Sequence, residues 1–184
     1  NTYGRFNVCF EKGKGSLLWD VEGKEYIDLG SGIGVTAFGV DDDEWSKAVI
    51  EQTHALNHIS NLYYSVPQIK LAELLCKKTG MKKVFFCNSG AESNECSIKA
   101  ARKYSHDKYG EGRNVIVTLV NSFHGRTVTT LSATGQDVFH QHFFPFTEGF
   151  IHTPANDIDA ALKVLTNPAV CAIMMEPIQG EGGV

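Results

Sequence analysis

Three turns in the sequence carry residue types suited to binding an anion, a planar ring or a carboxylate. The first contains Ser89-Gly90-Ala91, between an apolar run and a helical pattern. Small residues let the backbone approach an anion closely, and the amides of a first helical turn point outward without intrahelical partners. Ser89 adds a hydroxyl donor. The turn therefore suits a phosphate cradle, although a simple helix cap has the same signature.

The second turn, residues 121–126, combines an aromatic ring with a guanidinium. Phe123 is of the type that stacks on a planar ring. Arg126 matches a carboxylate with two parallel hydrogen bonds. A structural salt bridge would use the same arginine, so both roles stay open at this point.

The third turn, residues 176–183, carries Glu176 and Glu181 directly after an apolar run. Two carboxylates at the end of a strand suit a general acid/base pair or half of a metal site. Carboxylates that only organise the backbone are the other interpretation.

The elements that must position these turns alternate between strands and helices. Continuous apolar strands separated by helices indicate a parallel sheet covered on both faces, and ligands collect at the carboxyl ends of such strands. The sequence thus predicts an α/β fold. The predicted strands are Val84–Cys87, Asn114–Val120, Phe150–His152 and Val170–Met175, and the helices between them are Ala91–Tyr104 and Asn156–Leu165.

The N-terminal part of the chain predicts a small appendage, and its first forty residues are typical of short strands and turns. Ser16–Asp20 and Lys24–Asp28 flank a short glycine-containing loop and are typical of a hairpin. Residues 31–34 then suggest a flexible connection. Acidic residues 41–44 begin one helix, and residues 65–68 form a capping box that begins another.

Composition excludes several classes of protein. The 184 residues are 42% hydrophobic and 21% charged, and 17 Lys and Arg against 21 Asp and Glu give a net charge of −4. Without a basic stripe we expect no nucleic-acid partner. The apolar runs are too short for a membrane span. Five scattered cysteines and no leader predict free thiols in the cytoplasm.

No metal site is expected either. His140 and His142 lack a partnering carboxylate or cysteine at zinc spacing, and we expect both at the surface. The sequence stops within a glycine-rich loop that leaves a core strand, which suggests a chain cut from a longer one.

Together, these turns resemble the class III aminotransferases. Residues 89–95, 123–127 and 176–183 match the family in order and spacing, and residues 18–26 resemble its N-terminal hairpin. Residues 58–64 are similar to the acetylornithine aminotransferase branch in particular. The resemblance implies the fold type I architecture of pyridoxal 5′-phosphate (PLP) enzymes. Residues 1–56 would then belong to its small domain and 57–184 to the first part of the large, PLP-binding domain.

The resemblance implies a role for each matching cofactor residue. Ser89, Gly90 and Ala91 would hold the phosphate of PLP, and Phe123 would stack on its pyridine ring. The Schiff-base lysine and the aspartate at the pyridine nitrogen are expected after Val184. No catalytic residue is therefore expected within the chain, which would be inactive by itself.

Substrate roles are implied in the same way. Arg126 would bind a substrate carboxylate, and Glu181 matches the glutamate that gates a distant arginine. Glu176 would support the site, and Tyr64 would line the substrate tunnel, often that of the partner in a homodimer. Ile33 replaces a tyrosine typical of relatives acting on free ornithine, which leaves room for an acylated amine.

The implied activity moves the terminal amino group of N-acetylornithine to 2-oxoglutarate, in arginine biosynthesis. Another class III activity is the nearest alternative: succinylornithine, ornithine or 4-aminobutyrate aminotransferase, or glutamate-semialdehyde aminomutase. A non-catalytic α/β module that binds a ligand is the alternative from another class.

Overall fold

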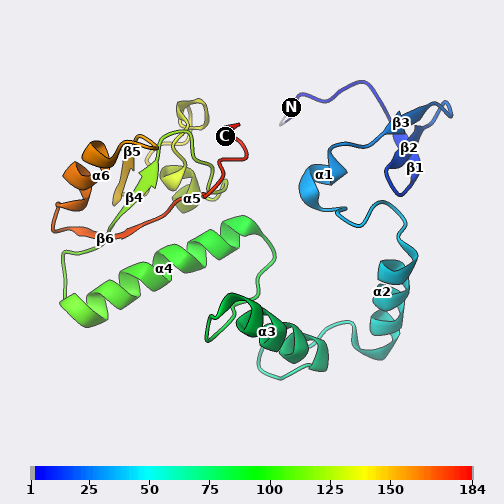
Figure 1. Ribbon diagram of the computed structural model, residues 1–184, viewed down its shortest axis with the longest axis horizontal. Helices are drawn as coiled ribbons and strands as arrows, with labels where there is room; N and C mark the ends of the chain where they lie inside the picture. Colours follow the sequence, from blue (N-terminus) through cyan, green and yellow to red (C-terminus); the bar gives the residue numbers. More distant parts are fainter. Residues whose placement is uncertain (1–2, 184) are drawn as a thin grey trace. The chain divides into compact units, whose positions relative to one another are not determined.

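The strands of the structure fall into two separate three-stranded sheets (Figure 1). The computed structural model describes residues 3–183. The chain divides after Leu74 into two units, one for each sheet. Each unit is described by itself.

The first sheet is an antiparallel meander of β1 (Phe10–Lys14), β2 (Leu17–Asp20) and β3 (Glu25–Ile27). The predicted hairpin is confirmed as β2 and β3, and Gly23 in the turn between them has a φ of 82°. A residue without a Cβ adopts this left-handed conformation at no steric cost. β1 was not predicted, because Phe10–Lys14 lacks the alternation of apolar and polar residues that indicates a strand.

The connection expected at residues 31–34 contains a left-handed turn, α1 (Ser31–Gly34). Gly32 and Ile33 both have a φ of 58° there. A β-branched residue rarely adopts this conformation. The side chain of Ile33 is 95% exposed.

Both helices predicted in the first eighty residues are confirmed, as α2 (Asp43–Leu56) and α3 (Val66–Thr79). The acidic run supplies the cap of α2, since Asp42 Oδ1 accepts a hydrogen bond from the Trp45 amide at 2.8 Å. That bond satisfies one of the unpaired amides of the first turn. Gly80, with a φ of 73°, follows the end of α3.

The second sheet is parallel, as predicted, with the strand order β5-β4-β6. Its strands are β4 (Val115–Leu119), β5 (Phe150–Thr153) and β6 (Val170–Ile173). Ile116 pairs with Phe150 on one side and Ala172 on the other. Because the strands are parallel, the turns that follow β4 and β6 lie at the same edge of this sheet.

Helices surround this sheet. Figure 1 shows α4 beside β6, and α6 beside β5. The two flanking helices are α4 (Gly90–Tyr109) and α6 (Ile158–Leu165). Two shorter helical segments lie between β4 and β5, namely α5 (Val128–Ala133) and the 3₁₀ turn η1 (Asp137–Phe139). The buried hydrophobic residues of the core are Ile98, Ile116, Val117, Leu131, Ala133 and Val170.

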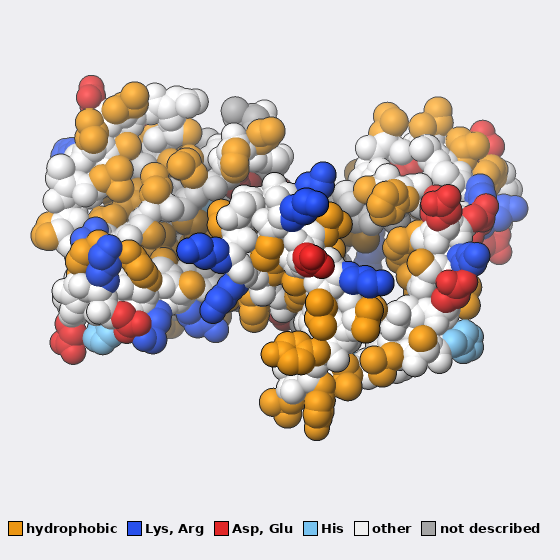
Figure 2. All heavy atoms as spheres, turned by 60° about the horizontal axis from the view of Figure 1, so that its bottom comes forward, with side chains coloured by type: hydrophobic (Ala, Val, Ile, Leu, Met, Phe, Trp, Pro, Cys, Tyr) orange, Lys and Arg blue, Asp and Glu red, His pale blue; other side chains and the backbone are white. Residues whose placement is uncertain are grey.

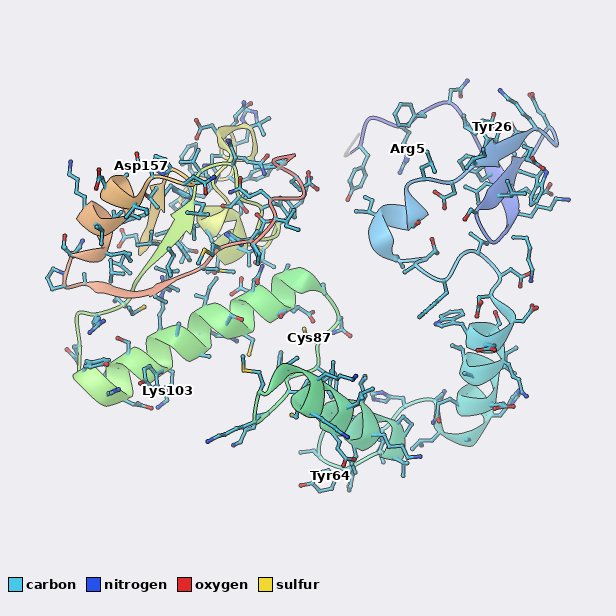
Figure 3. The ribbon with its side chains drawn as sticks, in the orientation of Figure 1. Arg5, Tyr26, Tyr64, Cys87, Lys103 and Asp157 are labelled. Carbon is cyan, nitrogen blue, oxygen red and sulfur yellow. The ribbon has the colours of Figure 1, made fainter. Side chains whose placement is uncertain are left out.

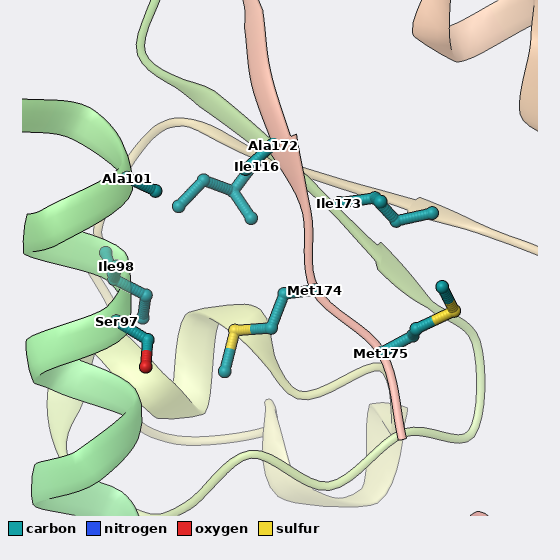
Figure 4. A pocket seen from close by; sticks show the side chains of 8 residues that line it. All are labelled: Ser97, Ile98, Ala101, Ile116, Ala172, Ile173, Met174 and Met175. Carbon is teal, nitrogen blue, oxygen red and sulfur yellow. The ribbon is translucent and has the colours of Figure 1, made fainter. Parts of the chain in front are cut away.

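A hollow of about 290 Å³ lies between α4 and β6 (Figure 4). Ile98 and Ala101 of α4 point into it from one side, and Ile116 and Met174 from the other. Its lining is therefore mainly hydrophobic.

One predicted strand is wrong. Val84–Cys87 runs into α4 without forming a strand. A strand is defined by hydrogen bonds to a neighbour, and within residues 3–183 this segment makes no backbone ladder. The helix after it is longer than predicted and continues to Tyr109.

Within the described part of the chain, no helix is long and apolar enough to cross a membrane. Residues 3–183 also hold no group of three or more His, Cys, Asp or Glu side chains that could bind a metal ion. His142 is exposed, whereas His140, which was also expected at the surface, is only partly exposed. Its ring packs on Phe146 at 5.0 Å, and its Nε2 lies 3.0 Å from the Leu131 carbonyl oxygen at α5.

Candidate functional site

The first turn of the site is the N-terminus of α4. Ser89 is its N-cap, and Ser89 Oγ accepts a hydrogen bond from the Glu92 amide at 3.2 Å. The Glu92 carboxylate in return accepts from the Asn88 amide at 2.6 Å. No hydrogen bond among residues 3–183 uses the amides of Gly90 and Ala91. These amides at the positive end of a 20-residue helix are suited to binding an anion.

Space in front of this turn is open. A Cβ placed on Gly90 would meet nothing within 4 Å. The turn therefore has both the donors and the room for a phosphate group. Capping by Ser89 does not compete with this role, because the cap uses the amide of Glu92 and leaves those of Gly90 and Ala91 free.

The second turn places an aromatic ring beside a guanidinium. Phe123 is half-buried and packs edge-on against Phe139, with ring centroids 5.8 Å apart. Arg126 Cζ lies 4.8 Å from the centroid of Phe139 and 5.8 Å from that of Phe123. Arg126 is exposed and makes none of the ion pairs found within residues 3–183. A structural salt bridge therefore has no acidic partner in that part of the chain.

Hydrogen bonds fix the second turn to the segment that follows α5. The His124 amide donates to Thr134 Oγ1 at 3.0 Å. The Gly135 amide donates to Ser122 Oγ at 3.1 Å, and Gln136 Nε2 donates to the Ser122 carbonyl at 3.1 Å. These three hydrogen bonds thus anchor the second turn to residues 134–136.

The third turn closes on the second. Glu176 Oε2 accepts a hydrogen bond from the Phe123 amide at 2.8 Å, and Gln179 Nε2 donates to the Val120 carbonyl at 3.1 Å. Glu176 thus organises backbone next to the ring of Phe123. Glu181 is exposed and belongs to none of the ion pairs in the described range.

The first and second turns also meet. A Cβ on Gly125 would lie 2.8 Å from Ala91 Cβ and 3.1 Å from Ala91 Cα. Only a glycine fits at position 125 without moving one of the two turns. The structure therefore brings all three predicted turns to one edge of the parallel sheet.

Two contacts between α4 and the second turn were missed from sequence. Asn94 Nδ2 donates to the His124 carbonyl at 2.8 Å, and Thr127 Oγ1 donates to Glu95 Oε1 at 2.6 Å. The signal was the spacing of Ala91, Asn94 and Glu95, which share one helix face with the buried Ile98. Polar residues on a buried face need partners, which in this case belong to the second turn.

His124 is buried inside the second turn, with 4% of its surface exposed. Burial lowers the pKa of His124, the charge of Glu176 raises it in part, and His152 lowers it further. The ring is therefore neutral at physiological pH. Its Nε2 has no hydrogen-bond partner among the described residues.

Tyr64 belongs to the first unit, whereas the three turns belong to the second. It lies just before α3 with 89% of its surface exposed (Figure 3). Its role toward a substrate stays a prediction.

The three turns together suit a ligand that has a phosphate, a planar ring and a nearby carboxylate. The free amides of Gly90 and Ala91 match the phosphate. The ring of Phe123 matches a planar group, and the guanidinium of Arg126, which makes no ion pair within residues 3–183, matches a carboxylate. PLP and an amino-acid substrate carry these groups, so the residues present fit that cofactor.

A family model described as Aminotransferase class-III matches residues 1–184. An acetylornithine aminotransferase of Haemophilus ducreyi is 55% identical over 183 residues, which are all of this chain and 47% of that relative. An acetylornithine aminotransferase of Gloeobacter violaceus is 47% identical and is covered to 46%. The chain spans about half the length of the curated relatives it matches.

Solved structures give the same picture. The N-acetylornithine aminotransferase of Stenotrophomonas maltophilia K279a is 38% identical, with a TM-score of 0.81 over 99% of this chain and 44% of that one. The ornithine aminotransferase of Toxoplasma gondii ME49 is 29% identical, with a TM-score of 0.93 over the whole of this chain and 44% of that one. A second structure of the Toxoplasma gondii enzyme is described with PLP partly occupying its active site. The fold predicted from the sequence is confirmed.

Proposed function

Since this chain belongs to the class III aminotransferases, we propose that the protein containing it transfers the terminal amino group of N-acetylornithine to 2-oxoglutarate, using PLP. The observation that carries the proposal is the assembly of the three turns at one sheet edge. Relatives named acetylornithine aminotransferase, 45–55% identical to this chain, support the choice of substrate.

In the proposed site the first turn binds the cofactor. The amides of Gly90 and Ala91 and the hydroxyl of Ser89 hold its phosphate, and Phe123 stacks on its ring. When bound, PLP supplies an electron sink for proton transfer at the carbon next to the amine. The protein contributes orientation and charge. Glu176 contributes indirectly, because it holds the backbone of Phe123 in place.

Substrate recognition is assigned to charged groups at the rim. Arg126 is exposed, and its planar fork suits the carboxylate of either substrate. Glu181 is exposed in the third turn and suits the family's gate, which pairs with an arginine outside this chain. Ile33 supports an acylated amine over free ornithine, since an apolar side chain there does not bind the charged end of ornithine.

A homodimer is proposed as the working assembly. Figure 2 shows hydrophobic side chains gathered at the surface, and the exposed ones around the start of α3 are Leu62, Tyr63, Tyr64 and Val66. Exposed clusters of this kind mark interaction surfaces. Tyr64 would then contribute to the site of the partner. The five free cysteines support a reducing compartment such as the cytoplasm, and the named relatives support a place in arginine biosynthesis.

The test is a substrate comparison on the intact protein that contains this chain. Rates with 2-oxoglutarate are measured for N-acetylornithine, N-succinylornithine, ornithine and 4-aminobutyrate at saturating PLP. We expect kcat/KM for N-acetylornithine to exceed that for ornithine at least about tenfold, the discrimination that shape alone supplies. A preference for ornithine or 4-aminobutyrate would assign another activity of the family. Reversible binding of PLP without turnover of any amine would identify a ligand-binding module.

A further inference from the structure

Two polar side chains of α4 reach from the phosphate turn to the turn that carries Phe123 and Arg126. Asn94 and Glu95 lie on the second turn of the helix, directly above Ala91. Asn94 Nδ2 donates to the His124 carbonyl at 2.8 Å. Glu95 Oε1 accepts from Thr127 Oγ1 at 2.6 Å. Asn94 and Glu95 thus contact the backbone next to Phe123 and the residue next to Arg126.

The Glu95 contact reaches one further element. Thr127 is the N-cap of α5, and its side chain also accepts from the Thr130 amide at 3.3 Å. The Thr127 hydroxyl that donates to Glu95 is therefore the same hydroxyl that caps the N-terminus of α5. A hydrogen bond to an ionised carboxylate is stronger than one between neutral groups.

The phosphate turn and the second turn are in direct contact at Gly125. Its backbone lies directly on Ala91, so that even a methyl group would not fit between them. Asn94 and Glu95 act on either side of this contact, at His124 and at Thr127. Their two hydrogen bonds therefore keep the second turn in contact with the phosphate turn at Gly90 and Ala91.

The other attachments of the second turn lead elsewhere. His124 and Ser122 are tied to Thr134–Gln136, and Phe123 is tied to Glu176 after β6. Loss of Asn94 or Glu95 would leave these bonds in place. The turn would stay folded but would no longer be held at a set distance from α4.

We propose that Asn94 and Glu95 are positioning residues that hold Phe123 and Arg126 in register with the phosphate turn. They touch neither the cofactor nor the substrate, and act through His124 and Thr127. This inference rests on the proposed function, because the register matters only for a ligand that spans both turns.

The experiment compares Asn94→Ala, Glu95→Ala and Glu95→Gln in the intact protein. Asp107→Asn is the matched control, since Asp107 is an exposed carboxylate on the same helix, and among the described residues its ion pair is with Lys103. The readouts are the Kd for PLP, visible circular dichroism of bound PLP, KM and kcat for 2-oxoglutarate, and the thermal melt without PLP. Visible dichroism reports how the ring is seated, and a merely structural role would not change it in a folded variant.

We expect Asn94→Ala and Glu95→Ala to raise the Kd for PLP about tenfold, to weaken the visible dichroism and to raise KM for 2-oxoglutarate more than they lower kcat. Glu95→Gln keeps an acceptor for Thr127 and should recover part of each change. The melt without PLP should fall by only a few degrees. Asp107→Asn should match the parent in every readout.

Two results overturn the inference while the proposed function stands: variants that bind PLP within about twofold of the parent with unchanged dichroism, or an Asp107→Asn effect of equal size. If Glu95→Ala does not fold, Glu95→Gln and Asn94→Ala decide by the same criteria. A cycle combining Glu95→Ala with Thr127→Val adds a second criterion where these variants fold, since additive effects on the Kd would show that Glu95 does not act through Thr127. A parent protein that binds no PLP would instead remove the proposed function.

Discussion

The carboxylate of Glu176 accepts a hydrogen bond from the backbone amide of Phe123 at 2.8 Å, across 53 residues of sequence. The bond joins the end of β6 to the turn after β4. Glu176 is half-buried, and the amide it binds belongs to the residue assigned to the cofactor ring. Its carboxylate thus holds the backbone that places that ring.

Replacing Glu176 by alanine should therefore weaken the fold before it weakens substrate binding. A charge-assisted hydrogen bond contributes about 1.5–3 kcal/mol, and urea unfolding of Glu176→Ala should show a loss of that order. Glu176→Gln keeps an acceptor and should lose less. Glu111→Ala removes an exposed carboxylate and should change the free energy of unfolding by less than about 0.5 kcal/mol. A large rise in KM with unchanged stability would instead place Glu176 against the substrate.

Arg126→Lys should reduce activity without reducing stability. The lysine keeps the charge but loses the two-pronged geometry, and losing a bidentate carboxylate contact costs about 2–4 kcal/mol, roughly 30- to 1,000-fold in kcat/KM. PLP binding and the thermal melt should stay close to those of the parent. The measurement is steady-state kinetics on N-acetylornithine and 2-oxoglutarate beside a melt.

Arg113→Lys is the matched control for Arg126. Arg113 Nε donates to the Val170 carbonyl at 2.9 Å, so this arginine ties the chain to the start of β6. Its replacement should lower the melting temperature and leave kcat/KM nearly normal. If Arg126→Lys behaves in this way, with kcat/KM for both substrates within about twofold of the parent, Arg126 does not clamp a carboxylate.

Gly90→Val should weaken PLP binding in a protein that still folds. A Cβ at Gly90 would meet nothing within 4 Å among the described residues, so the added side chain should be tolerated by the fold and should obstruct the incoming phosphate. Losing one or two charge-assisted amide bonds costs roughly 1.5–3 kcal/mol each, which is tenfold or more in the Kd. Fluorescence titration with PLP measures it.

Gly125→Ala provides the contrast. Its Cβ would meet Ala91 Cβ at 2.8 Å and Thr130 Oγ1 at 2.7 Å, at a residue whose φ is 127°. This variant should lower both the melting temperature and the affinity for PLP. For the Gly90→Val variant, an unchanged Kd for PLP in a folded protein would exclude the turn of residues 89–91 from the phosphate site.

The stability of the protein should fall in mild acid because of His124. Burial lowers the pKa of His124 in the folded state, while an unfolded histidine titrates near a pKa of about 6.5. Below that pH the unfolded state binds more protons, so the contribution of His124 is present above about pH 6.5 and is lost as the pH falls toward the folded pKa. Urea unfolding of the parent and of His124→Gln between pH 7.5 and 5.5 should show a shallower pH dependence in the variant.

His142→Gln serves as the control, because this side chain is exposed. It should reproduce the pH dependence of the parent. Equal slopes for the parent and His124→Gln would mean that His124 takes up its proton over the same pH range in the folded and unfolded states, so that burial does not lower its pKa.

Most elements were predictable because local patterns encode them. β4 is a continuous apolar run, and α6 begins after Asp157, which caps it by accepting from the Ala160 amide at 2.9 Å. The prediction of a strand at Val84–Cys87 was wrong for a physical reason. An apolar extended segment has the same composition whether or not a neighbouring strand is present to pair with it.

The candidate site residues could also be predicted from the sequence, but the residues that hold their turns in place could not. Ser89, Phe123 and Arg126 stand in turns after apolar runs, where chemistry is expected. The approach of Gly125 to Ala91 is a tertiary contact that no spacing reports. Asn94 and Glu95 were hidden inside a helix, where polar residues are usually taken as solvent-facing.

The strand order β5-β4-β6 has a consequence for synthesis of the protein. The central strand, β4, is made first, and both of its neighbours emerge from the ribosome later. Until Val170–Ile173 has been made, the nascent chain exposes at least one unpaired edge of β4 next to Ile116 and Val117, a situation that invites aggregation. Chains released before that point should depend on chaperones. In a series of products ending between residues 120 and 175, the backbone amides of β4 should become protected from hydrogen exchange only when β6 is complete.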